Sequence, residues 1–328
     1  MPQRVVIWNC SLTPLEFPPA PAHFADPVFR PATERPPMSN AASPLRLVPE
    51  ASALPPGARI AQIQPAVGSF ISGYRFDGKP LSDEFRSRLR DLLHNRGVVV
   101  FETGTVTAEN FTVFAGFLGE FFHYAGPHTP RAPENPDATT IDSVRDKHLR
   151  NHIWHADGGF RSDAPAFTAL YAHILPEGGG GDTMFSNTAW VYENLDPLFA
   201  AYLDSLKVIQ SADATGHITD RYLDAEEATK ARIKMPPFEM PLVRVHPVTG
   251  RKWIAVNESY VAYVRGVSRV TSQNLLGILF DMIKSPEATC RHAWAQGQLA
   301  IWDNRVVQHK GIKDYGGRRV LYRATMTA

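Results

Sequence analysis

The sequence predicts a mostly β protein, a β-sandwich or open barrel with helices at its periphery. Two amphipathic helical segments come early, and short strand-like segments separated by Gly, Pro and Asn/Asp turns follow them. Candidate ligand residues occur on several of these strands, and the mouth of such a barrel commonly holds a metal or a small ligand. These observations favour a fold built around one binding site.

The composition limits the classes of partner. The 328 residues are enough for a substantial core, and 44% hydrophobic with 20% charged residues is ordinary for a globular protein. The net charge of +1 gives no electrostatic preference for nucleic acid or an anionic membrane. No apolar run approaches the roughly 20 residues that cross a bilayer, and no signal-peptide-like segment is present. We therefore expect neither nucleic acid nor membrane as a partner.

The cysteines are few. Cys10 and Cys290 are the two in the sequence, which excludes a disulfide framework and a thiolate metal cluster. A reducing, cytoplasmic location fits this usage.

The proline distribution divides the chain. Residues 1–56 hold 13 of the 27 prolines, and proline at this density removes backbone donors and blocks regular structure. We expect an extended or disordered segment over 1–56 and a folded domain over 57–328.

Local signals predict the first elements of the domain. Residues 60–72 alternate loosely between apolar and polar and predict a strand. Ser82 can cap an amphipathic helix that Gly97 ends. The apolar run 98–101 predicts a buried strand, and residues 107–118 predict a second amphipathic helix.

The second half of the chain alternates between short strands and helices. Residues 211–240 have weak periodicity and mixed charge, which predicts a long mobile excursion. The other expected elements are a strand at 167–174, a turn at 178–181, a helix at 187–206 with Pro197 near its middle, a hairpin with strands at 240–245 and 252–256, a helix at 272–284, and strands near 290–295, 298–303 and 319–326.

Two histidines and one acid form a candidate metal site. His155 and Asp157 belong to the only His-x-acid triplet in the sequence, and residues i and i+2 of a strand point to the same side. His309 is the candidate third ligand. Two histidines and one carboxylate on one face of Fe(II) leave positions open for substrate and oxygen. The alternatives are an unrelated surface pair with a core histidine, or a structural zinc site.

Two arginines follow His309 in strand-like sequence. Arg319 and Arg323 are four positions apart, so they share a face of the strand. Guanidinium groups inside a barrel need anions, and their geometry suits carboxylate recognition. The alternative is a structural ion pair with Asp303 or Asp314.

Two polar residues lie near these groups in the sequence. Thr183, just after the glycine run, can donate its hydroxyl to the same carboxylate; otherwise it is a turn residue. Asn151 precedes His155 by four positions and can face the pocket; otherwise it is a loop asparagine.

With these motifs, residues 60–328 resemble the taurine dioxygenase (TauD/TfdA) group of Fe(II)/2-oxoglutarate-dependent dioxygenases. The resemblance implies a double-stranded β-helix (jelly-roll, cupin-like) core. The matching motifs are GSFISG at 68–73, KPLS at 79–82, WHAD at 154–157, GGDT at 180–183, VHPVTG at 245–250 and WDNR at 302–305, continuing through His309 to Arg323.

The resemblance also implies a role for each candidate residue. His155, Asp157 and His309 match the catalytic iron ligands. Arg319 and Thr183 match the residues that bind the distal carboxylate of 2-oxoglutarate. The implied substrate-binding residues are Arg323, which would meet an anionic group, Asn151, Tyr260, and His123, which lies near the position of a substrate histidine.

The implied reaction is hydroxylation of a small anionic substrate (a sulfonate, sulfate ester or carboxylate) with 2-oxoglutarate and O2 as co-substrates and succinate and CO2 as co-products. Asp157 favours hydroxylation, because related halogenases lack this carboxylate. Ala156 stands where threonine is usual, so taurine itself is not indicated. The alternatives are a biosynthetic hydroxylase or desaturase of an amino-acid-like metabolite and a non-catalytic barrel that binds a small acid. A homo-oligomer stays open, because relatives often associate.

Overall fold

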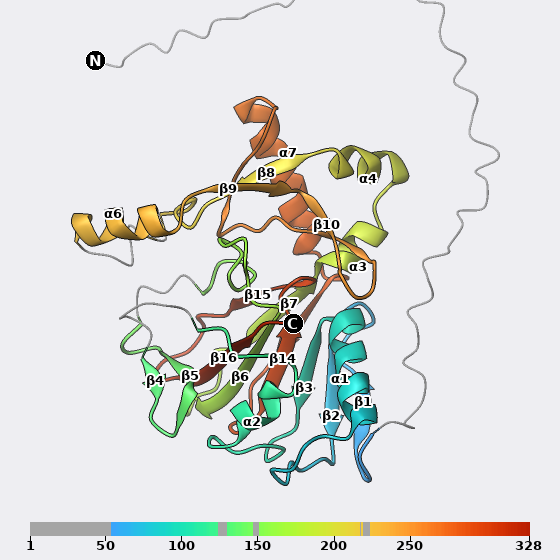
Figure 1. The fold of residues 1–328 in the computed structure, drawn as a ribbon, viewed down its shortest axis with the longest axis vertical. Helices are drawn as coiled ribbons and strands as arrows, with labels where there is room; N and C mark the ends of the chain where they lie inside the picture. The colour runs from blue at the N-terminus through green and yellow to red at the C-terminus, as the bar shows by residue number, and fades with distance from the viewer. Residues whose placement is uncertain (1–53, 124–129, 147–150, 217, 219–223) are drawn as a thin grey trace, which may run out of the picture. The chain divides into compact units, whose positions relative to one another are not determined.

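The structure is a computed structural model that describes residues 54–123, 130–146, 151–216, 218 and 224–328 (Figure 1). The proline-rich segment expected over 1–56 lies outside the described residues except for its last positions. Across the described ranges, none of the helices has the length and apolar character that crossing a bilayer requires.

Two sheets packed against each other form the jelly-roll core. The smaller sheet contains β13 (Thr289–His292), β7 (Thr183–Asn187) and β15 (Val307–Gly311), in this order. The order of the larger sheet is β1 (Arg59–Gln62), β2 (Ser69–Ser72), β3 (Val98–Phe101), β14 (Leu299–Asp303), β6 (Phe167–Ile174), β16 (Val320–Met326), β5 (Asn135–Asp142) and β4 (Arg131–Ala132). The predicted class, mostly β with peripheral helices, is confirmed.

Strand β3 shows how the larger sheet separates two cores. Val99 packs in an apolar cluster with the helices α1 (Asp83–Arg96) and α2 (Phe111–Gly116). Val98, on the other face, packs in a second cluster that includes Phe185 of the smaller sheet. Successive side chains of a strand point to opposite faces, so this fully buried strand serves both cores.

Helix α1 begins and ends where its capping residues predict. The Ser82 hydroxyl accepts a hydrogen bond from the Phe85 backbone N–H, and Gly97 closes the helix with a φ of 81°. Glycine adopts this left-handed conformation without the Cβ penalty of other residues.

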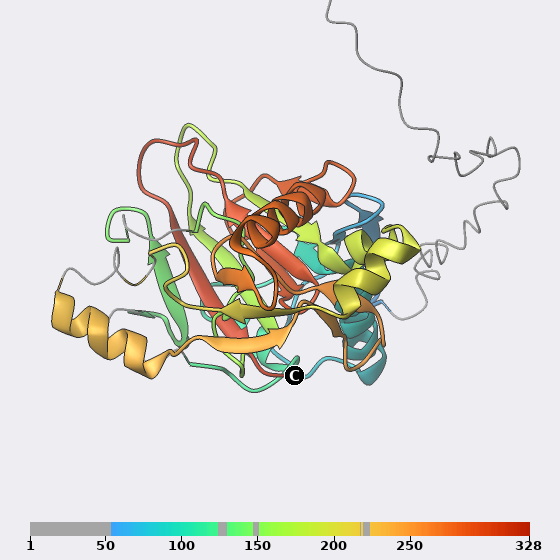
Figure 2. The same ribbon diagram turned by 90° about the horizontal axis from the view of Figure 1, so that it is seen from above.

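A third layer covers the smaller sheet with its own apolar cluster (Figures 1 and 2). Figure 2 looks down on this layer and shows α6 projecting from its edge. Its elements are α3 (Thr188–Glu193), α4 (Pro197–Asp204), β8 (Lys207–Gln210), α6 (Ala225–Lys234), β9 (Phe238–Pro241), β10 (Val243–Val245), β11 (Lys252–Ile254), β12 (Val261–Val264) and α7 (Arg269–Ile283).

Two predicted elements are each divided in the structure. The single strand expected over 60–72 is the antiparallel pair β1 and β2, because the chain reverses near Gly68, whose φ is 88°. The single helix expected over 187–206 is α3 followed by α4. Pro197 takes the first turn of α4, where its missing N–H costs no hydrogen bond.

Other predicted elements begin or end at different residues in the structure. The helix expected from residue 107 begins at Phe111, because residues 107–110 form a turn in which the Asn110 side chain accepts from the Thr107 N–H. The excursion expected over 211–240 contains α6 and β9, although residues 217 and 219–223 lie outside the described residues. The hairpin around residues 246–250 is confirmed as the antiparallel pair β10 and β11.

Candidate active site

His155, Asp157 and His309 meet at one buried point. Their ligand atoms all lie within 4.8 Å of one another. The two histidines are joined by reciprocal backbone hydrogen bonds, 3.0 Å from the His155 N–H and 2.8 Å from the His309 N–H. Their rings are 4.2 Å apart at the centroids. The three side chains that the sequence predicted to act together are therefore adjacent.

The local conformation around Asp157 differs from the prediction. A strand was expected to carry both His155 and Asp157, but His155 makes an isolated bridge to His309 and the chain turns directly after Asp157. Gly158 permits this turn with a φ of 72°. The Thr168 hydroxyl of β6 donates to the Asp157 carboxylate at 2.9 Å. This hydrogen bond orients the carboxylate, although Asp157 does not belong to a strand.

The protonation states suit metal binding. The His155 Nδ1 donates to the Ile153 carbonyl at 2.7 Å, so its Nε2 faces the cluster as an acceptor. Burial lowers the pKa of His155 and lowers that of His309 to about 3. Burial opposes ionisation of Asp157, but His309 and Arg323 outweigh it and lower the pKa of this carboxyl. Two neutral imidazoles and one carboxylate on one face fit a divalent iron ion.

Arg319 is a buried cation beside Gly181. It is 5% exposed, and within the described part of the chain it has no salt bridge and its Nε has no hydrogen-bond partner. The alternative ion pairs are wrong, because Asp303 binds Arg305 and Asp314 binds Arg291, both at 2.7 Å. A buried guanidinium without a carboxylate is costly, so Arg319 fits an anionic ligand.

Gly181 makes room for Arg319. A Cβ at Gly181 would lie 2.7 Å from the Arg319 Cδ, and Gly181 has a φ of 74°. Both the space and the backbone conformation require glycine here.

Thr183 lies on the same face of the smaller sheet as the metal cluster. On β7 it is two positions from Phe185, which pairs with His309 of β15, and residues two apart share a face. The Trp294 indole donates to the Thr183 hydroxyl oxygen at 3.0 Å. The hydroxyl hydrogen can therefore point to a ligand.

Arg323 of β16 reaches the cluster directly. Its Nη1 lies 3.5 Å from an Asp157 carboxylate oxygen. Arg319 precedes β16 and Arg323 lies within it. Arg323 therefore lies beside Asp157, and Arg319 lies beside Gly181, one residue before the strand that was expected to carry both arginines.

The other three candidates were predicted to bind the substrate. His123 is at the surface, where its Nδ1 is 2.9 Å from Arg131. Asn151 accepts a hydrogen bond from the Gly311 N–H through its backbone carbonyl at 2.7 Å. Tyr260 is buried with its ring against Phe160. Their roles in substrate binding stay predictions.

A second His/Asp cluster was not predicted. One oxygen of Asp303 accepts from His94 at 2.9 Å, from His246 at 3.0 Å and from Arg305 at 2.7 Å. The His246 Nδ1 accepts from backbone N–H groups, so both of its nitrogens are used. With Arg305 supplying the counter-charge, this cluster is a closed structural network rather than a cation site.

Comparison with known proteins agrees with this geometry. The family model described as "Taurine catabolism dioxygenase TauD, TfdA family" matches residues 59–325. A sulfonate dioxygenase dependent on α-ketoglutarate from Saccharomyces cerevisiae is 28% identical over 268 residues, covering 78% of this chain and 63% of its own length. An alkylsulfatase of Acinetobacter baylyi is 32% identical over 205 residues, covering 61% of this chain and 63% of its own. This chain thus spans less than two thirds of these relatives.

Solved structures extend the match to the fold. A taurine dioxygenase from Burkholderia xenovorans superimposes with a TM-score of 0.68 at 27% identity, covering 83% of this chain and 89% of its own. The AAD-2 protein in complex with Mn(II) and N-oxalylglycine superimposes with a TM-score of 0.69 at 25% identity, covering 82% and 96%. The jelly-roll core, the buried triad and the family match lead to one conclusion: this chain belongs to the TauD/TfdA dioxygenase family.

Proposed function

We propose that this protein is an Fe(II)- and 2-oxoglutarate-dependent dioxygenase that hydroxylates a small anionic substrate, with succinate and CO2 as co-products. The observation that carries the proposal is the buried triad of His155, Asp157 and His309 together with the buried Arg319, which has no salt bridge among the described residues. When bound, iron and 2-oxoglutarate would supply oxygen activation for attack on a C–H bond. The residues supply positioning.

Arg319 and Thr183 would hold the distal carboxylate of 2-oxoglutarate. A guanidinium and a hydroxyl are suitable donors for it. Their burial excludes water that would compete for the carboxylate, and it strengthens the charge interaction. The other end of 2-oxoglutarate would then face the triad.

Arg323 would meet the anionic group of the substrate. It borders Asp157, so an anion bound there would be held close to the metal. The yeast and Acinetobacter relatives are named for a sulfonate and an alkyl sulfate, which supports a sulfonate, sulfate ester or carboxylate. We propose supporting roles in this pocket for Asn151, Tyr260 and His123. The same proposal places the enzyme in the cytoplasm, with small molecules rather than nucleic acid as partners.

The test is succinate formation by full-length protein loaded anaerobically with Fe(II), then given 2-oxoglutarate, O2 and a panel of sulfonates, alkyl sulfates, aryloxyacids and amino acids. We expect turnover stimulated by one class of anion. His155→Ala and Arg319→Gln should abolish turnover. Arg318→Gln is the matched control, because this neighbouring arginine pairs with Asp142 instead.

Three outcomes would separate the alternatives. Turnover with amino acids alone would favour the biosynthetic hydroxylase or desaturase. Binding of iron and 2-oxoglutarate without oxygen consumption, with every compound in the panel, would favour a non-catalytic barrel. Absence of Fe(II) binding would contradict the proposal.

A further inference from the structure

A cavity lies beside β15, the strand that carries His309. Its volume is about 260 Å³. Gln308, the neighbour of His309 on β15, lines it, as does Ala156, between His155 and Asp157. Val307 of the same strand lines the cavity too, whereas His309 does not. Asp157 borders it as well, so the cavity adjoins the metal cluster without containing the two histidines.

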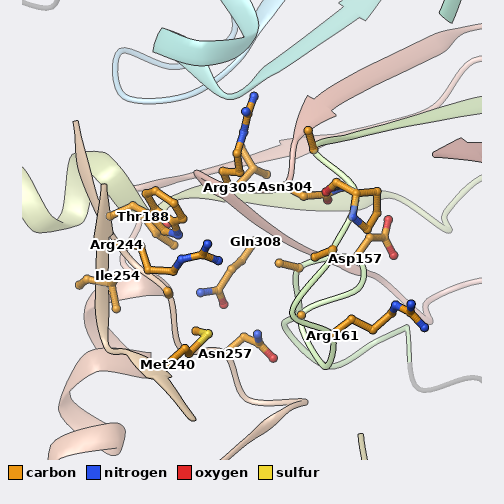
Figure 3. A pocket seen from close by; sticks show the side chains of 18 of the residues that line it. Asp157, Arg161, Thr188, Met240, Arg244, Ile254, Asn257, Asn304, Arg305 and Gln308 are labelled. Carbon is orange, nitrogen blue, oxygen red and sulfur yellow. Dashed lines mark hydrogen bonds between the residues drawn. The ribbon is translucent and has the colours of Figure 1, made fainter. Parts of the chain in front are cut away.

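One arginine of the lining has no acidic partner. Arg244 of β10 lies over the Trp253 ring, 5.3 Å from its centroid, and among the described residues it has no salt bridge. The other two arginines of the lining are paired: Arg161 binds Asp163 and Arg305 binds Asp303, both at 2.7 Å. Figure 3 shows the Arg244 guanidinium extending toward Gln308. The cavity therefore presents one guanidinium that is available to an anion.

Gln308 contributes an unsatisfied acceptor. The side chain is 3% exposed, and its Nε2 donates to the Val256 carbonyl at 2.6 Å. This bond fixes the amide orientation, and the Oε1 is left buried without a partner in the described part of the protein. A buried carbonyl oxygen without a donor is destabilising, so the site calls for a ligand that donates a hydrogen bond.

Asn257, which lines the same cavity as Gln308, contributes a hydrogen-bond donor. Its Oδ1 accepts from the Tyr260 N–H at 3.0 Å. Its Nδ2 has no hydrogen-bond partner within the described ranges and lies where a Cβ on Gly159 would come within 3.1 Å of it. Figure 3 shows the side chains of Asn257, Gln308 and Arg244 around one space, with Met240 beside them.

We propose that this cavity is a second ligand site for a small carboxylate that also carries a hydroxyl or ammonium group. Arg244 and the Asn257 amide would hold the carboxylate. The Gln308 Oε1 would accept from the hydroxyl or ammonium, which a plain carboxylate or a sulfate cannot provide. Met240 and Ile254 form an apolar wall. The volume is below the roughly 300 Å³ at which drug-sized pockets begin, so the ligand is small.

Three probes of equal carbon number test the donor requirement: lactate, alanine and propionate. We would measure their binding to the full-length protein by equilibrium dialysis, with Mn(II) and N-oxalylglycine present to occupy the metal site. Lactate or alanine should bind at one site, and propionate about tenfold more weakly, because it leaves the Gln308 oxygen unpaired.

The variants locate the site. Arg244→Gln should weaken lactate or alanine binding at least about tenfold, as expected for loss of a charge-assisted contact, and Arg244→Lys should restore part of it. Arg161→Gln is the matched control, because this lining arginine already pairs with Asp163. Thermal unfolding of each variant confirms the fold.

Several results would overturn the proposal. They are equal binding of propionate and lactate, indifference to Arg244→Gln, displacement by N-oxalylglycine, and no saturable binding of lactate or alanine. If the metal site fails to bind Mn(II), dialysis without it still tests this cavity, so the two proposals fail independently.

Discussion

At the scale of the residue, Asp303 shows how one side chain organises the region behind the metal centre. It joins His94 of α1, His246 of the β10–β11 turn and Arg305 of the segment that leads into β15. Burial opposes ionisation, but hydrogen bonds from His246, His94 and Arg305 outweigh it, so the pKa of Asp303 is lowered. The carboxylate is therefore ionised at neutral pH and holds three separate parts of the chain together.

Removing this carboxylate should be costly. Asp303→Ala leaves Arg305 and two histidines without their acceptor, and breaking such a buried pair typically costs about 3–5 kcal/mol. Urea unfolding at pH 7 measures the change in the free energy of unfolding. Asp163→Ala, which breaks the surface pair with Arg161, should change it by less than about 1 kcal/mol. Equal losses for the two variants would contradict the structural role of Asp303.

Gly181 offers a test of Arg319 with a close control. Gly181→Ala should weaken 2-oxoglutarate binding at least about tenfold, because the new Cβ displaces the Arg319 side chain. Gly179→Ala imposes the same left-handed backbone strain, with a φ of 77°, but its Cβ meets nothing within 4 Å. Anaerobic calorimetry of both Fe(II)-loaded variants separates the two effects. Similar affinities of the two variants for 2-oxoglutarate would show that the position of Arg319 does not depend on the space that Gly181 leaves.

At the scale of the element, capping decides where helices begin. Ser82→Ala removes the acceptor for the Phe85 N–H and should lower the free energy of unfolding by about 1 kcal/mol. Ser82→Asn supplies an alternative cap and should recover most of the loss. Urea unfolding of the three proteins gives the comparison, and an Asn variant as weak as the Ala variant would argue against capping as the cause.

Elements with strong local signals could be predicted from the sequence. The cap and stop of α1 and the apolar run of β3 depend only on nearby residues. The conformation at Asp157 could not be predicted in this way, since the Thr168 hydroxyl and the bridge to His309 come from distant strands. The triad was predicted because His155, Asp157 and His309 stand in motifs that resemble a known family, whereas the His-x-acid triplet alone is a weak signal. The sequence predicted Asp303 only as a possible ion-pair partner of Arg319 or Arg323. Its contacts with His94 and His246 could not be predicted, because both histidines are far from it in the sequence.

At the scale of the whole molecule, a buried histidine makes stability depend on pH. Burial lowers the pKa of His292 to about 4, below its ordinary value of about 6.5. Between these values the unfolded chain binds a proton that the native state does not, so stability falls as the pH decreases. For this group the loss between pH 7 and pH 5 is about 2 kcal/mol.

His292→Gln isolates this contribution from those of the other histidines. The difference in the free energy of unfolding between pH 7 and pH 5 should be about 2 kcal/mol smaller in the variant than in the parent protein. Urea unfolding of the metal-free proteins at the two pH values measures it. The same pH dependence in both would mean that the pKa of His292 is not lowered in the native state.

The contact between Arg323 and Asp157 has a consequence for synthesis. These residues are 166 positions apart, and ribosomes add about 5–20 residues per second. Asp157 therefore leaves the peptidyl-transferase centre on the order of ten seconds before its partner is made. For most of that interval the nascent chain also lacks β15 and His309. A chain that stalls before His309 cannot hold the complete set of three ligands, so a metal would be bound only after nearly all of the domain has been translated.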